Sequence, residues 1–485
     1  MRKNISNMRR FFLLTAVLLL ALSCNKQQPQ PDPGTSGSPK RDQQYYTNLF
    51  AYNIMNPYYL WRDKMEEELQ DWNYSMNPVE KVASLRYKEN GKLVDRWTQL
   101  MDDYTPFQAG VTGNGKSFGL DFVLLRVKDS EDVVMEVTLT FADSPARKAG
   151  LKRGDIVLSV DGVTLNMDNY ADILNNKLYD FPETVSLGML DGSTVTMSAI
   201  QMYSNPVHEA RTLEVKNRKV GYLHFTDFTL DACKDLVEVF RKFKADGIQE
   251  LVLDLRYNTG GYVITGQVLA SMIAPPDVVQ RKEIFNKDVY NSIIGPEMNE
   301  ETRFAPTMEI TLSSGKTMLN MLNANPGIER LWVLVTGRSA SASESLICGL
   351  KPYMDVRLVG SQTHGKFCGG YLITAENFFK QLEKQKTDID FQEAYSYTQK
   401  WGLYVIASRY ADCNGVTLSM PDGIPADYEA YDEPRDGYQL GDPSESMLSV
   451  ALGLMGGLPH AMPTKGAVER MEIPFEKPGS GALLH

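Results

Sequence analysis

The second half of the chain alternates between short apolar runs and helical patterns, and this alternation constrains the fold more than any other feature. The runs Val220–Phe225, Glu250–Leu255, Leu331–Val335 and Val356–Val359 are apolar and have the length of strands. A helical pattern from Leu230 to Ala245 follows the first of them. Apolar strands joined by helices are typical of parallel sheets, in which both faces are covered. The sequence therefore predicts an α/β domain with a parallel or mixed sheet and crossover helices.

Two other patterns precede this domain in a chain of 485 residues, a length that suits two or three domains. From Tyr45 to about Tyr104 aromatic and aliphatic residues recur at helical spacing, with Pro57 and Pro78 as breaks. Between Lys116 and about Met202, short β-like runs are separated by Gly and Asp residues. We therefore expect a small helical N-terminal domain and then a β-rich domain.

The first residues have the pattern of an export signal. Arg9 and Arg10 precede an apolar run over residues 11–22, and the small residue Ser23 follows it. The run is too short for a comfortable membrane span, so we expect a cleaved signal over residues 1–23 and not an anchor helix.

The residues around the expected cleavage point indicate a lipid anchor. Ala21-Leu22-Ser23-Cys24 resembles a bacterial lipoprotein box, which implies that Cys24 becomes the lipidated first residue. The polar stretch from Asn25 to Asp42, rich in Gln, Pro, Gly and Ser, then has the composition of a flexible tether. We expect a protein of the bacterial cell envelope, held to a membrane by its lipid alone, either facing the periplasm or on the outer-membrane surface.

Composition limits the classes of partner. Hydrophobic residues make up 43% and charged residues 23% of the chain, which is ordinary for a folded domain protein. The net charge is −11, and removal of residues 1–23, which carry four basic and no acidic residues, makes it −15. This charge argues against nucleic acid as a partner. No His/Glu or Cys/Cys spacing matches a metal-ligand set, so no metal or other cofactor is expected.

Four cysteines remain after Cys24: Cys233, Cys348, Cys368 and Cys413. An even number in an exported protein permits disulfides without requiring them. Cys348 and Cys368 flank the most informative motifs, but buried free cysteine is the commoner fate for such scattered positions. We expect free thiols in preference to a Cys348–Cys368 bridge.

Three of the expected strands lead to residues that can carry chemistry. The strand ending at Val335 leads to Ser341 at the start of a helix, the next strand leads to Lys366, and the strand ending at Leu255 leads to Gly260 and Gly261. Sites in parallel α/β sheets form where the carboxyl ends of strands meet the next elements. If these strands are neighbours, the three features lie on one rim of the sheet.

Ser341 and Lys366 have the chemistry of a nucleophile and its base. A serine hydroxyl is inert at neutral pH unless a neighbour takes its proton, and a lysine does this only if burial or nearby positive charge lowers its pKa. The pairing therefore predicts a half-buried lysine. Ser339 and Ser343 in the same run compete with Ser341 by composition.

Backbone amides beside Ser341 could bind the oxyanion of a tetrahedral intermediate. The Ala342 amide lies at a helix start, where N–H groups are unpaired, and the amide of Gly260 or Gly261 could join it. Taken alone, each of these features has a structural interpretation. The Ser-rich turn could be only a helix cap, the lysine a solvated side chain, and the glycine pair a tight turn. Their joint order is what carries information.

The β-rich segment has the motif order of a PDZ domain over about 85 residues. Ser117-Phe118-Gly119-Leu120 opens it, Ala149–Val157 contains the Gly154-Asp155 turn, and Val160-Asp161-Gly162 forms a further turn. In PDZ domains consecutive amides around a glycine hold a terminal carboxylate, and the peptide adds to the sheet edge as a strand. Phe118, Gly119 and Leu120 would supply that nest.

The joint order resembles the carboxyl-terminal processing, or tail-specific, proteases, a family of Ser/Lys serine peptidases with an embedded PDZ domain. The matching pieces are the PDZ-like segment, Asp254–Gly261, Ser339–Glu344, Thr363–Lys366 and Pro421–Pro425. In the family the middle serine of the run is the nucleophile and the motif lysine is the general base, which implies Ser341 and Lys366. The resemblance implies a serine endopeptidase that cleaves proteins or peptides and recognises their C-terminal region.

The predicted organisation follows from the resemblance and the patterns together. It is a signal peptide over 1–23, a lipidated tether over 24–43, a helical domain over 44–115, a PDZ domain over 116–205, a peptidase α/β domain over 206–460 and a tail over 461–485. The long stretch from Ala274 to Glu329 is expected to be a lid or a substrate-binding insertion. The oligomeric state is left open.

Departures from the family leave alternatives. Many relatives carry a glutamine shortly after the lysine to orient it, but here Phe367-Cys368-Gly369-Gly370 follows and no glutamine appears before Gln381. A peptide-binding lipoprotein with weak or no catalysis is therefore the first alternative, and a lipoprotein that binds a small hydrophobic ligand is another. A Ser/His/Asp triad would need one of five histidines, of which His364 is nearest in sequence.

Overall fold

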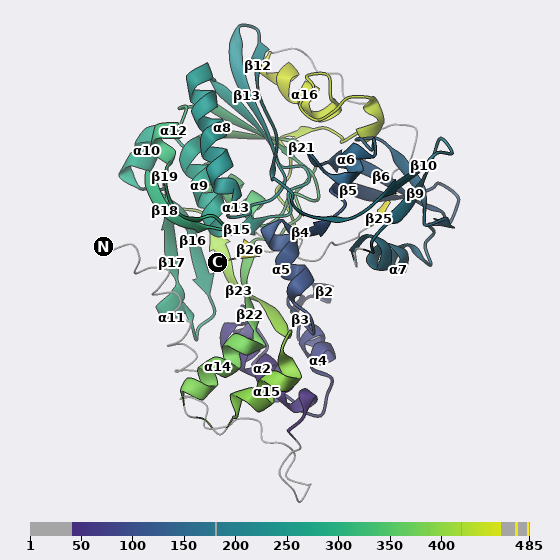
Figure 1. Cartoon of the computed structure of the whole chain (residues 1–485). Coiled ribbons are helices and arrows are strands. Elements are labelled where there is room, and N and C mark those ends of the chain that lie inside the picture. Colours follow the sequence, from purple (N-terminus) through teal and green to yellow (C-terminus); the bar gives the residue numbers. More distant parts are fainter. Residues whose placement is uncertain are drawn as a thin grey trace, which may run out of the picture.

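The computed structural model describes residues 41–179, 182–385, 387, 389–418, 420–456, 471–473 and 483–484. The expected signal peptide, Cys24 and most of the tether lie outside the described residues. Figure 1 shows the α/β domain above, the PDZ-like domain beside it and an elongated lower part that contains the first helices. The α/β and PDZ-like parts are present as predicted, whereas the N-terminal helices share one core with the α/β part and do not form a separate domain.

A six-stranded sheet forms the centre of the α/β domain, in the order β12-β13-β14-β20-β21-β24. All strands except β12 run parallel. The four predicted strands are confirmed. Their apolar residues are buried on both faces of the sheet, which explains why the pattern was visible in the sequence. The bounds are β12 (Val207–Val215), β13 (Arg218–Phe225), β14 (Glu250–Asp254), β20 (Arg330–Val335), β21 (Asp355–Gly360) and β24 (Tyr428–Glu429).

Helices cover both faces of this sheet and connect its parallel strands. The predicted helix between the first two strands is α8, which ends at Gly247 in a left-handed conformation that glycine adopts without strain. The last helix, α16, packs on the other face against Val252 and Leu334. The bounds are α8 (Ala232–Asp246), α9 (Val263–Ile273), α13 (Ala342–Leu350), the short helix η3 (Pro434–Asp436) and α16 (Ser446–Met455).

The register of the parallel strands aligns the three motifs. Asp254 at the end of β14 pairs with Leu334 of β20, and Leu334 pairs with Val359 of β21. Gly260, Ser341 and Lys366 therefore follow strand ends that lie side by side. The expected common rim is present.

A second, mixed sheet was not predicted and joins the segments that leave this rim. Its order is β15-β26-β22-β23-β16-β17, and β3 pairs with β23. It contains the residues directly after Gly260 and those shortly after Lys366. The bounds are β3 (Gln99–Met101), β15 (Gly261–Tyr262), β16 (Ile284–Tyr290), β17 (Glu300–Arg303), β22 (Cys368–Thr374), β23 (Gly402–Ala411) and β26 (Leu483–Leu484).

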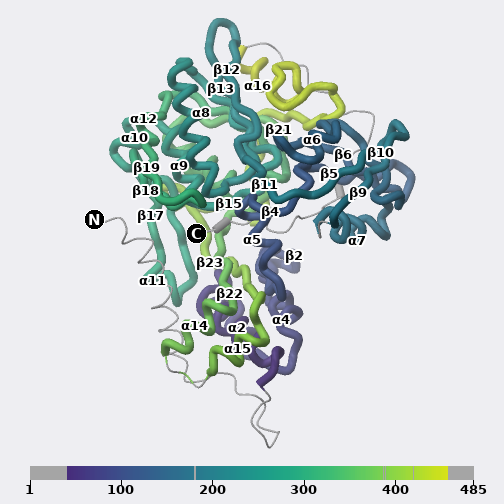
Figure 2. Tube along the Cα trace, viewed as in Figure 1, coloured from purple at the N-terminus to yellow at the C-terminus, as the bar shows by residue number. Residues whose placement is uncertain are grey.

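The N-terminal helices share their core with this second sheet. Helix α2 begins after Asp42, whose side chain accepts a hydrogen bond from the amide of Tyr45, and it packs against α14, α15 and β23. Figure 2 shows the purple and green segments side by side in the lower part. The bounds are α2 (Gln43–Tyr58), η1 (Arg62–Lys64), α3 (Glu66–Gln70), α4 (Pro78–Ser84), β1 (Lys88–Glu89), β2 (Lys92–Leu93), α5 (Thr105–Thr112), α14 (Ala375–Lys384) and α15 (Phe391–Thr398).

The PDZ-like domain has its own apolar core, built around Leu124, Met135 and Val157. Its sheet has the order β10-β9-β7-β6-β5-β25, and a two-stranded stalk of β4 and β11 leads into and out of it. The bounds are β4 (Asn114–Ser117), β5 (Leu120–Arg126), β6 (Val133–Thr140), α6 (Pro145–Lys148), β7 (Ile156–Val160), β8 (Val163–Thr164), α7 (Tyr170–Leu174), the π-helical turn η2 (Asn175–Tyr179), β9 (Val185–Met189), β10 (Thr194–Met197), β11 (Ile200–Tyr203) and β25 (Met471–Ile473).

The segment expected to be a lid is instead part of the body of the domain. It supplies β16 and β17 to the second sheet, and a hairpin of β18 and β19 that contacts α12 and α8. Its residues Phe285 and Phe304 are buried in the main core, which holds the segment in place. The further bounds are α10 (Pro276–Arg281), α11 (Gly295–Met298), β18 (Thr307–Leu312), β19 (Gly315–Asn320) and α12 (Met321–Ala324).

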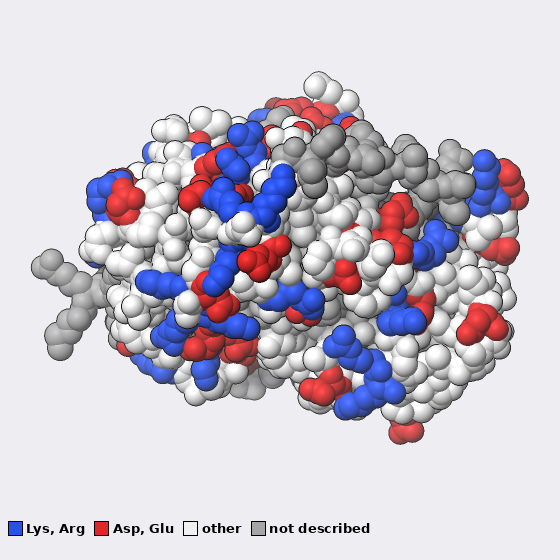
Figure 3. Space-filling view, turned by 90° about the horizontal axis from the view of Figure 1, so that it is seen from above, with Lys and Arg blue, Asp and Glu red and all other residues white. Residues whose placement is uncertain are grey.

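Cys233, Cys348, Cys368 and Cys413 are free thiols, as expected. In the part of the chain that the structure describes, no helix has the length and apolar character needed to cross a bilayer. On the face shown in Figure 3, basic and acidic side chains are interspersed and no single-sign basic patch dominates.

Candidate active site

The three serines of the run lie where β20 passes into α13, and their hydroxyls have different surroundings. Ser339 Oγ donates to the carbonyl of Leu255 at 2.8 Å, and Ser343 Oγ donates to that of Asn258 at 3.1 Å. Ser341 Oγ is buried and has no hydrogen-bond partner among the described residues. Ser341 also has φ 61° and ψ −110°, which residues with a Cβ rarely adopt. Such strain is typical of functional positions, so the geometry favours Ser341 over its two neighbours.

Lys366 is completely buried, more than the half-burial expected from the sequence. Its Nζ lies 3.3 Å from the hydroxyl of Tyr404, 5.1 Å from the centre of the same ring and 4.9 Å from the centre of the Trp97 ring. Tyr404 comes from β23 and Trp97 from the N-terminal part of the chain. These two aromatic residues contact the Lys366 ammonium group, and their distance from it in sequence explains why sequence reasoning missed them.

The carboxylate of Glu344 holds the serine turn and the lysine turn together. Its Oε2 accepts hydrogen bonds from the amides of Ser341 and Lys366, both at 2.9 Å. Its Oε1 accepts from the hydroxyl of Thr363 at 2.6 Å and from the amide of Gly365 at 2.7 Å. The backbones of the candidate nucleophile and base are thus bound to one carboxylate oxygen. The sequence contained a signal for this role of Glu344, because a glutamate three residues into a helix commonly caps the helix start.

A tyrosine on the second sheet makes a second link between the two turns. The hydroxyl of Tyr410 lies 3.2 Å from the carbonyl oxygen of Ser341 and 3.1 Å from that of Lys366. The Ser341 Oγ to Lys366 Nζ hydrogen bond itself is not formed, although the two backbones are adjacent. Catalytic hydrogen bonds often tighten only when substrate binds.

Replacing Glu344 by Gln is expected to lower kcat roughly 100-fold, because small displacements of reacting groups cost this much. A glutamine amide can accept on one side only, so two of the four donors lose their acceptor and the free energy of unfolding falls by about 2–4 kcal/mol. Burial raises the pKa of Glu344, and the hydrogen bonds from Thr363, Gly365, Ser341 and Lys366 oppose that rise.

Peptidase kinetics and urea unfolding measure the two effects of this substitution. The matched control is Glu376→Gln, the same change at a partly exposed glutamate of α14 that pairs with Lys380. The control should leave both quantities nearly unchanged. A Glu344→Gln variant with parental kcat would contradict the positioning role.

One of the three backbone amides expected to bind an oxyanion already donates a hydrogen bond within the protein. The Gly260 amide donates to Asn258 Oδ1 at 2.9 Å, which leaves Gly261 of the two glycines to act with the first amide of α13, at Ala342. Gly260 has a different role: a Cβ at this position would lie 2.8 Å from Ser341 Cβ and 3.2 Å from the Ala342 nitrogen. Only glycine permits this approach and its φ of 116°.

His364, the histidine nearest the site in sequence, does not form a triad with Ser341. Its Nδ1 lies 3.1 Å from the carbonyl oxygen of Gly337, and its ring lies beside that of Trp97. Burial and the nearby positive charge of Arg96 lower the pKa of His364 to about 4. The rival His mechanism therefore lacks the contact that it needs.

The expected carboxylate nest lies at the start of β5. Phe118 is buried, and Gly119 has φ 72° and would place a Cβ 2.2 Å from that of Ser144. The Gly119 amide donates to Ser117 Oγ at 2.9 Å, so one of the three expected amides is occupied. Leu120 begins β5 and pairs with Thr140.

An ion pair connects this nest to the serine turn. Asp121, directly after the nest, pairs with Arg338 at 2.9 Å, and Arg338 precedes the run Ser339–Ser341. The Arg338 guanidinium also lies 5.2 Å from the ring centre of Tyr257. The PDZ-like domain therefore makes a direct ion pair with the turn that carries Ser341.

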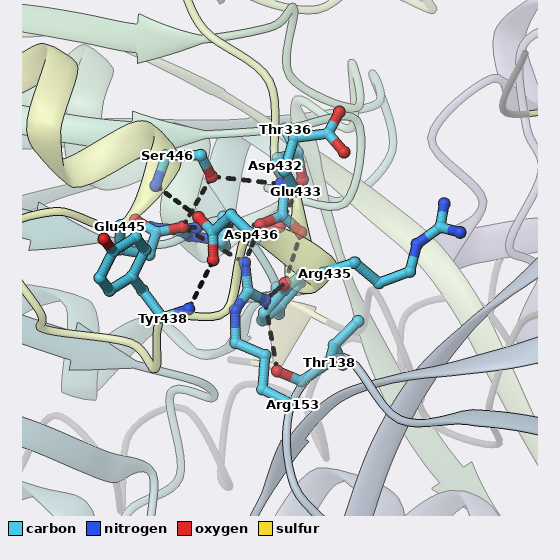
Figure 4. A network of polar contacts seen from close by, with 12 residues as sticks. Thr138, Arg153, Thr336, Asp432, Glu433, Arg435, Asp436, Tyr438, Glu445 and Ser446 are labelled. Atoms are coloured by element: carbon cyan, nitrogen blue, oxygen red, sulfur yellow. Dashed lines mark hydrogen bonds and ion pairs between the residues drawn. The ribbon is translucent and has the colours of Figure 1, made fainter. Parts of the chain in front are cut away.

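A buried charge network forms the larger junction between the two domains (Figure 4). Arg153 of the PDZ-like domain contacts Asp432 and Glu445, and Arg256 contacts Asp254, Asp432 and Glu445. Burial alone would raise the pKa of Asp432, but Arg153 and Arg256 outweigh burial and hold it well below its usual range. Because Arg256 closely precedes the glycine turn, the network also fixes one wall of the site.

Stability is expected to fall as the pH falls below about 6.5, partly because of His224. This ring is completely buried on β13, and neither ring nitrogen has a hydrogen-bond partner among the described residues. Burial, then His208 and two arginines, lower its pKa well below 6.5. The unfolded chain then binds the proton more tightly than the folded one. The contribution of His224 is complete above pH 6.5 and is lost as the pH falls towards the folded-state pKa.

Urea midpoints at pH 7.5 and pH 5 measure this effect. A His224→Gln variant should lose less stability between the two values than the parent protein. Some loss should remain, because the pKa values of His208 and His364 are lowered as well. An equal loss in parent and variant would contradict the assignment to His224.

Comparison with known proteins agrees with this geometry. The model of peptidase family S41 matches residues 219–430, and that of the PDZ domain matches residues 140–178. The chain is 27% identical over 289 residues to a carboxyl-terminal-processing protease of Picosynechococcus, covering 56% of this chain and 60% of that one. It is 25% identical over 260 residues to a CtpA-like serine protease of Staphylococcus aureus, covering 54% and 46%.

The matched relatives are longer than the matching part, so the chain spans less than two thirds of their length. A crystal structure of a Bacteroides fragilis protein assigned to the S41 proteases has a TM-score of 0.63 at 21% identity, over 89% of this chain and 99% of that one. That similarity shows a common fold. Residues 219–430 are therefore similar to peptidase family S41 and residues 140–178 to PDZ domains, and the curated relatives with which the chain aligns are named as proteases.

Proposed function

We propose that the protein is a serine endopeptidase that cleaves proteins or peptides and recognises their C-terminal region. The observation that carries the proposal is the position of Ser341, a strained, buried serine whose hydroxyl has no hydrogen-bond partner among the described residues. Its backbone amide donates to the same Glu344 carboxylate oxygen as the backbone amide of Lys366. The match of residues 219–430 to peptidase family S41 supports peptidase chemistry and protein or peptide substrates.

The chemistry would proceed through an acyl-enzyme. Ser341 Oγ attacks the carbonyl carbon of the scissile bond while its proton passes to Lys366 Nζ. The oxyanion is stabilised by the amide of Ala342 together with that of Gly261, each such donor contributing about 3 kcal/mol. Lys366 then gives the proton to the leaving amine, and water releases the acyl group with Lys366 acting again as base.

A serine-directed fluorophosphonate probe tests the nucleophile. The parent protein should be labelled at Ser341, as located by mass spectrometry of tryptic peptides, and Ser341→Ala should not be labelled. Ser339→Ala and Ser343→Ala are matched controls in the same turn and should still be labelled. Labelling of Ser341→Ala at parental level would refute the assignment.

The first alternative, a peptide-binding protein with weak or no catalysis, is favoured by two observations. Lys366 lacks the usual glutamine, and no hydrogen bond joins Ser341 Oγ to Lys366 Nζ. Binding of peptides without any turnover up to about pH 9, where a lysine base would begin to act, would support this alternative over the peptidase.

The location is a separate proposal that depends on the first 24 residues. Their pattern supports export and attachment to the cell envelope through lipid on Cys24. Metabolic labelling with a palmitate analogue tests it, with Cys24→Ser as the control that should lose the label.

A further inference from the structure

The PDZ domain already holds an extended segment on the edge where a peptide ligand would bind. Strand β25 pairs antiparallel with β5, in the register Met471 with Arg126, Glu472 with Leu125 and Ile473 with Leu124. Strand β5 begins at the nest residues Phe118–Leu120, so β25 runs towards the nest. This is the geometry of strand addition to a sheet edge.

A second part of the same late segment lies at the candidate active site. Strand β26, Leu483–Leu484, runs parallel to β15, where Leu483 pairs with Gly261 and Leu484 with Tyr262. Leu484 also pairs with Gly370 of β22. Strand β26 therefore lies between the strand that follows Gly260 and the strand that follows Lys366. Figure 1 shows β25 in the PDZ domain and β26 beside β15, far from each other.

These two contacts lead to an inference that rests on the proposed function. We propose that two short strands, β25 (Met471–Ile473) and β26 (Leu483–Leu484), act as internal ligands that occupy the strand edges used by a peptide substrate, one on β5 and one between β15 and β22. A substrate must displace these strands at both edges before its scissile bond can reach Ser341. The two strands thus act as built-in competitors of extended peptides.

Glycines lie on both strands that flank β26, Gly261 on β15 and Gly370 on β22. At Gly261 and Gly370 there is no side chain, and a Cβ would lie 2.6 Å from the Phe228 carbonyl oxygen or 2.5 Å from that of Val405. Glycines at strand positions permit close approach of another backbone. An extended chain between β15 and β22 also comes next to Gly261, a candidate oxyanion donor, so β26 and a reactive substrate exclude each other there.

A tethered competitor has a measurable effect on KM. A ligand within the same chain has an effective concentration of the order of 1 mM, so a strand with an intrinsic Kd of about 0.1 mM would raise the KM of substrates about tenfold. Because binding and not chemistry is opposed, kcat should stay within about twofold.

The test uses the full chain with proline at each pairing strand. Glu472→Pro and Leu483→Pro remove a backbone N–H and restrict the backbone, which weakens strand pairing. The combined variant should show a KM about tenfold lower for an unstructured peptide substrate. The matched control, Glu472→Gln with Leu483→Val, keeps both N–H groups and should keep the parental KM. An unchanged KM in the proline variant would overturn the proposal.

A binding measurement separates this inference from the proposed function. A fluorescent peptide with the sequence of residues 471–485 is titrated into Ser341→Ala proteins, and the proline variant should bind it about tenfold more tightly than its control. If the proteins with Ser341 intact show no turnover but this difference in affinity persists, the peptidase proposal fails and the internal ligand stands. Equal affinities would overturn the internal ligand while leaving peptidase activity untouched.

A second measurement covers the case in which the proline variant does not fold. Hydrogen exchange is followed on the Ser341→Ala chain, which carries no proline substitution. Saturating substrate peptide should speed exchange in the late segment, as residues 471–473 and 483–484 are displaced. Two outcomes would contradict the proposal. In the first, these residues already exchange at the unfolded rate before peptide is added; in the second, the added peptide does not change their exchange rate.

Discussion

Ser341→Ala and Lys366→Met are each expected to lower kcat/KM for an unstructured protein substrate by about 10⁴-fold or more, because the proposed nucleophile and base would act as one unit. Ser341 Oγ has no partner to lose in the folded protein, so Ser341→Ala should leave the free energy of unfolding nearly unchanged. Methionine at position 366 fills the buried space without a charge, and stability should be equal or higher. Loss of activity without loss of stability is the distinguishing result.

Ser339→Ala and Ser343→Ala serve as controls for that experiment. Each loses one hydrogen bond to a backbone carbonyl, which costs about 1 kcal/mol of stability, and activity should stay within about tenfold of the parent. A further comparison tests the strain at Ser341. Ser341→Gly should be inactive yet about 1 kcal/mol more stable than Ser341→Ala, since glycine adopts φ 61° without penalty. More than one hundredth of parental activity in Ser341→Ala would refute the nucleophile.

Arg256→Met is expected to lower the free energy of unfolding by about 3–5 kcal/mol, the largest stability effect that the structure indicates. Arg256 is completely buried and contacts Asp254, Asp432 and Glu445. Its removal leaves three carboxylates with Arg153 as the remaining arginine of the network. Urea unfolding followed by tryptophan fluorescence measures the loss.

The matched control is Arg241→Met, the same change at a half-exposed arginine that pairs with Glu238 on the surface of α8. It should cost no more than about 0.5 kcal/mol. Adding Glu445→Gln to Arg256→Met should recover part of the loss, because one uncompensated charge is removed. A loss in Arg256→Met as small as in the control would show that the network contributes little to stability.

The fold of the α/β domain could be predicted because its evidence is local. Four apolar runs and their turns indicated parallel strands, and the register of β14, β20 and β21 then places the glycine, serine and lysine motifs on one rim. The PDZ domain was predictable for the same reason. The second sheet was not, because β15, β22 and β26 are short or irregular and come from segments far apart in the chain.

The segment expected to be a lid shows the same limit. Ala274 to Glu329 has no recognisable partner in its own sequence, and only tertiary pairing makes β16 a strand of the second sheet. The helical N-terminal part was also expected to be a separate small domain. Its helices instead complete their core against α14, α15 and β23, since a short amphipathic helix needs an apolar surface supplied by another part of the chain.

The sequence by itself determined which residue types are present at the rim: a serine run, a lysine, two glycines and a helix start, in the order of the family. Tertiary structure alone decided how they are supported. Glu344 joins the serine and lysine turns, Trp97 and Tyr404 surround Lys366, and the Gly260 amide is taken by Asn258. The physical reason is that motifs report local backbone geometry, whereas burial, charge pairing and the direction of a hydrogen bond depend on segments that meet only when the chain is folded.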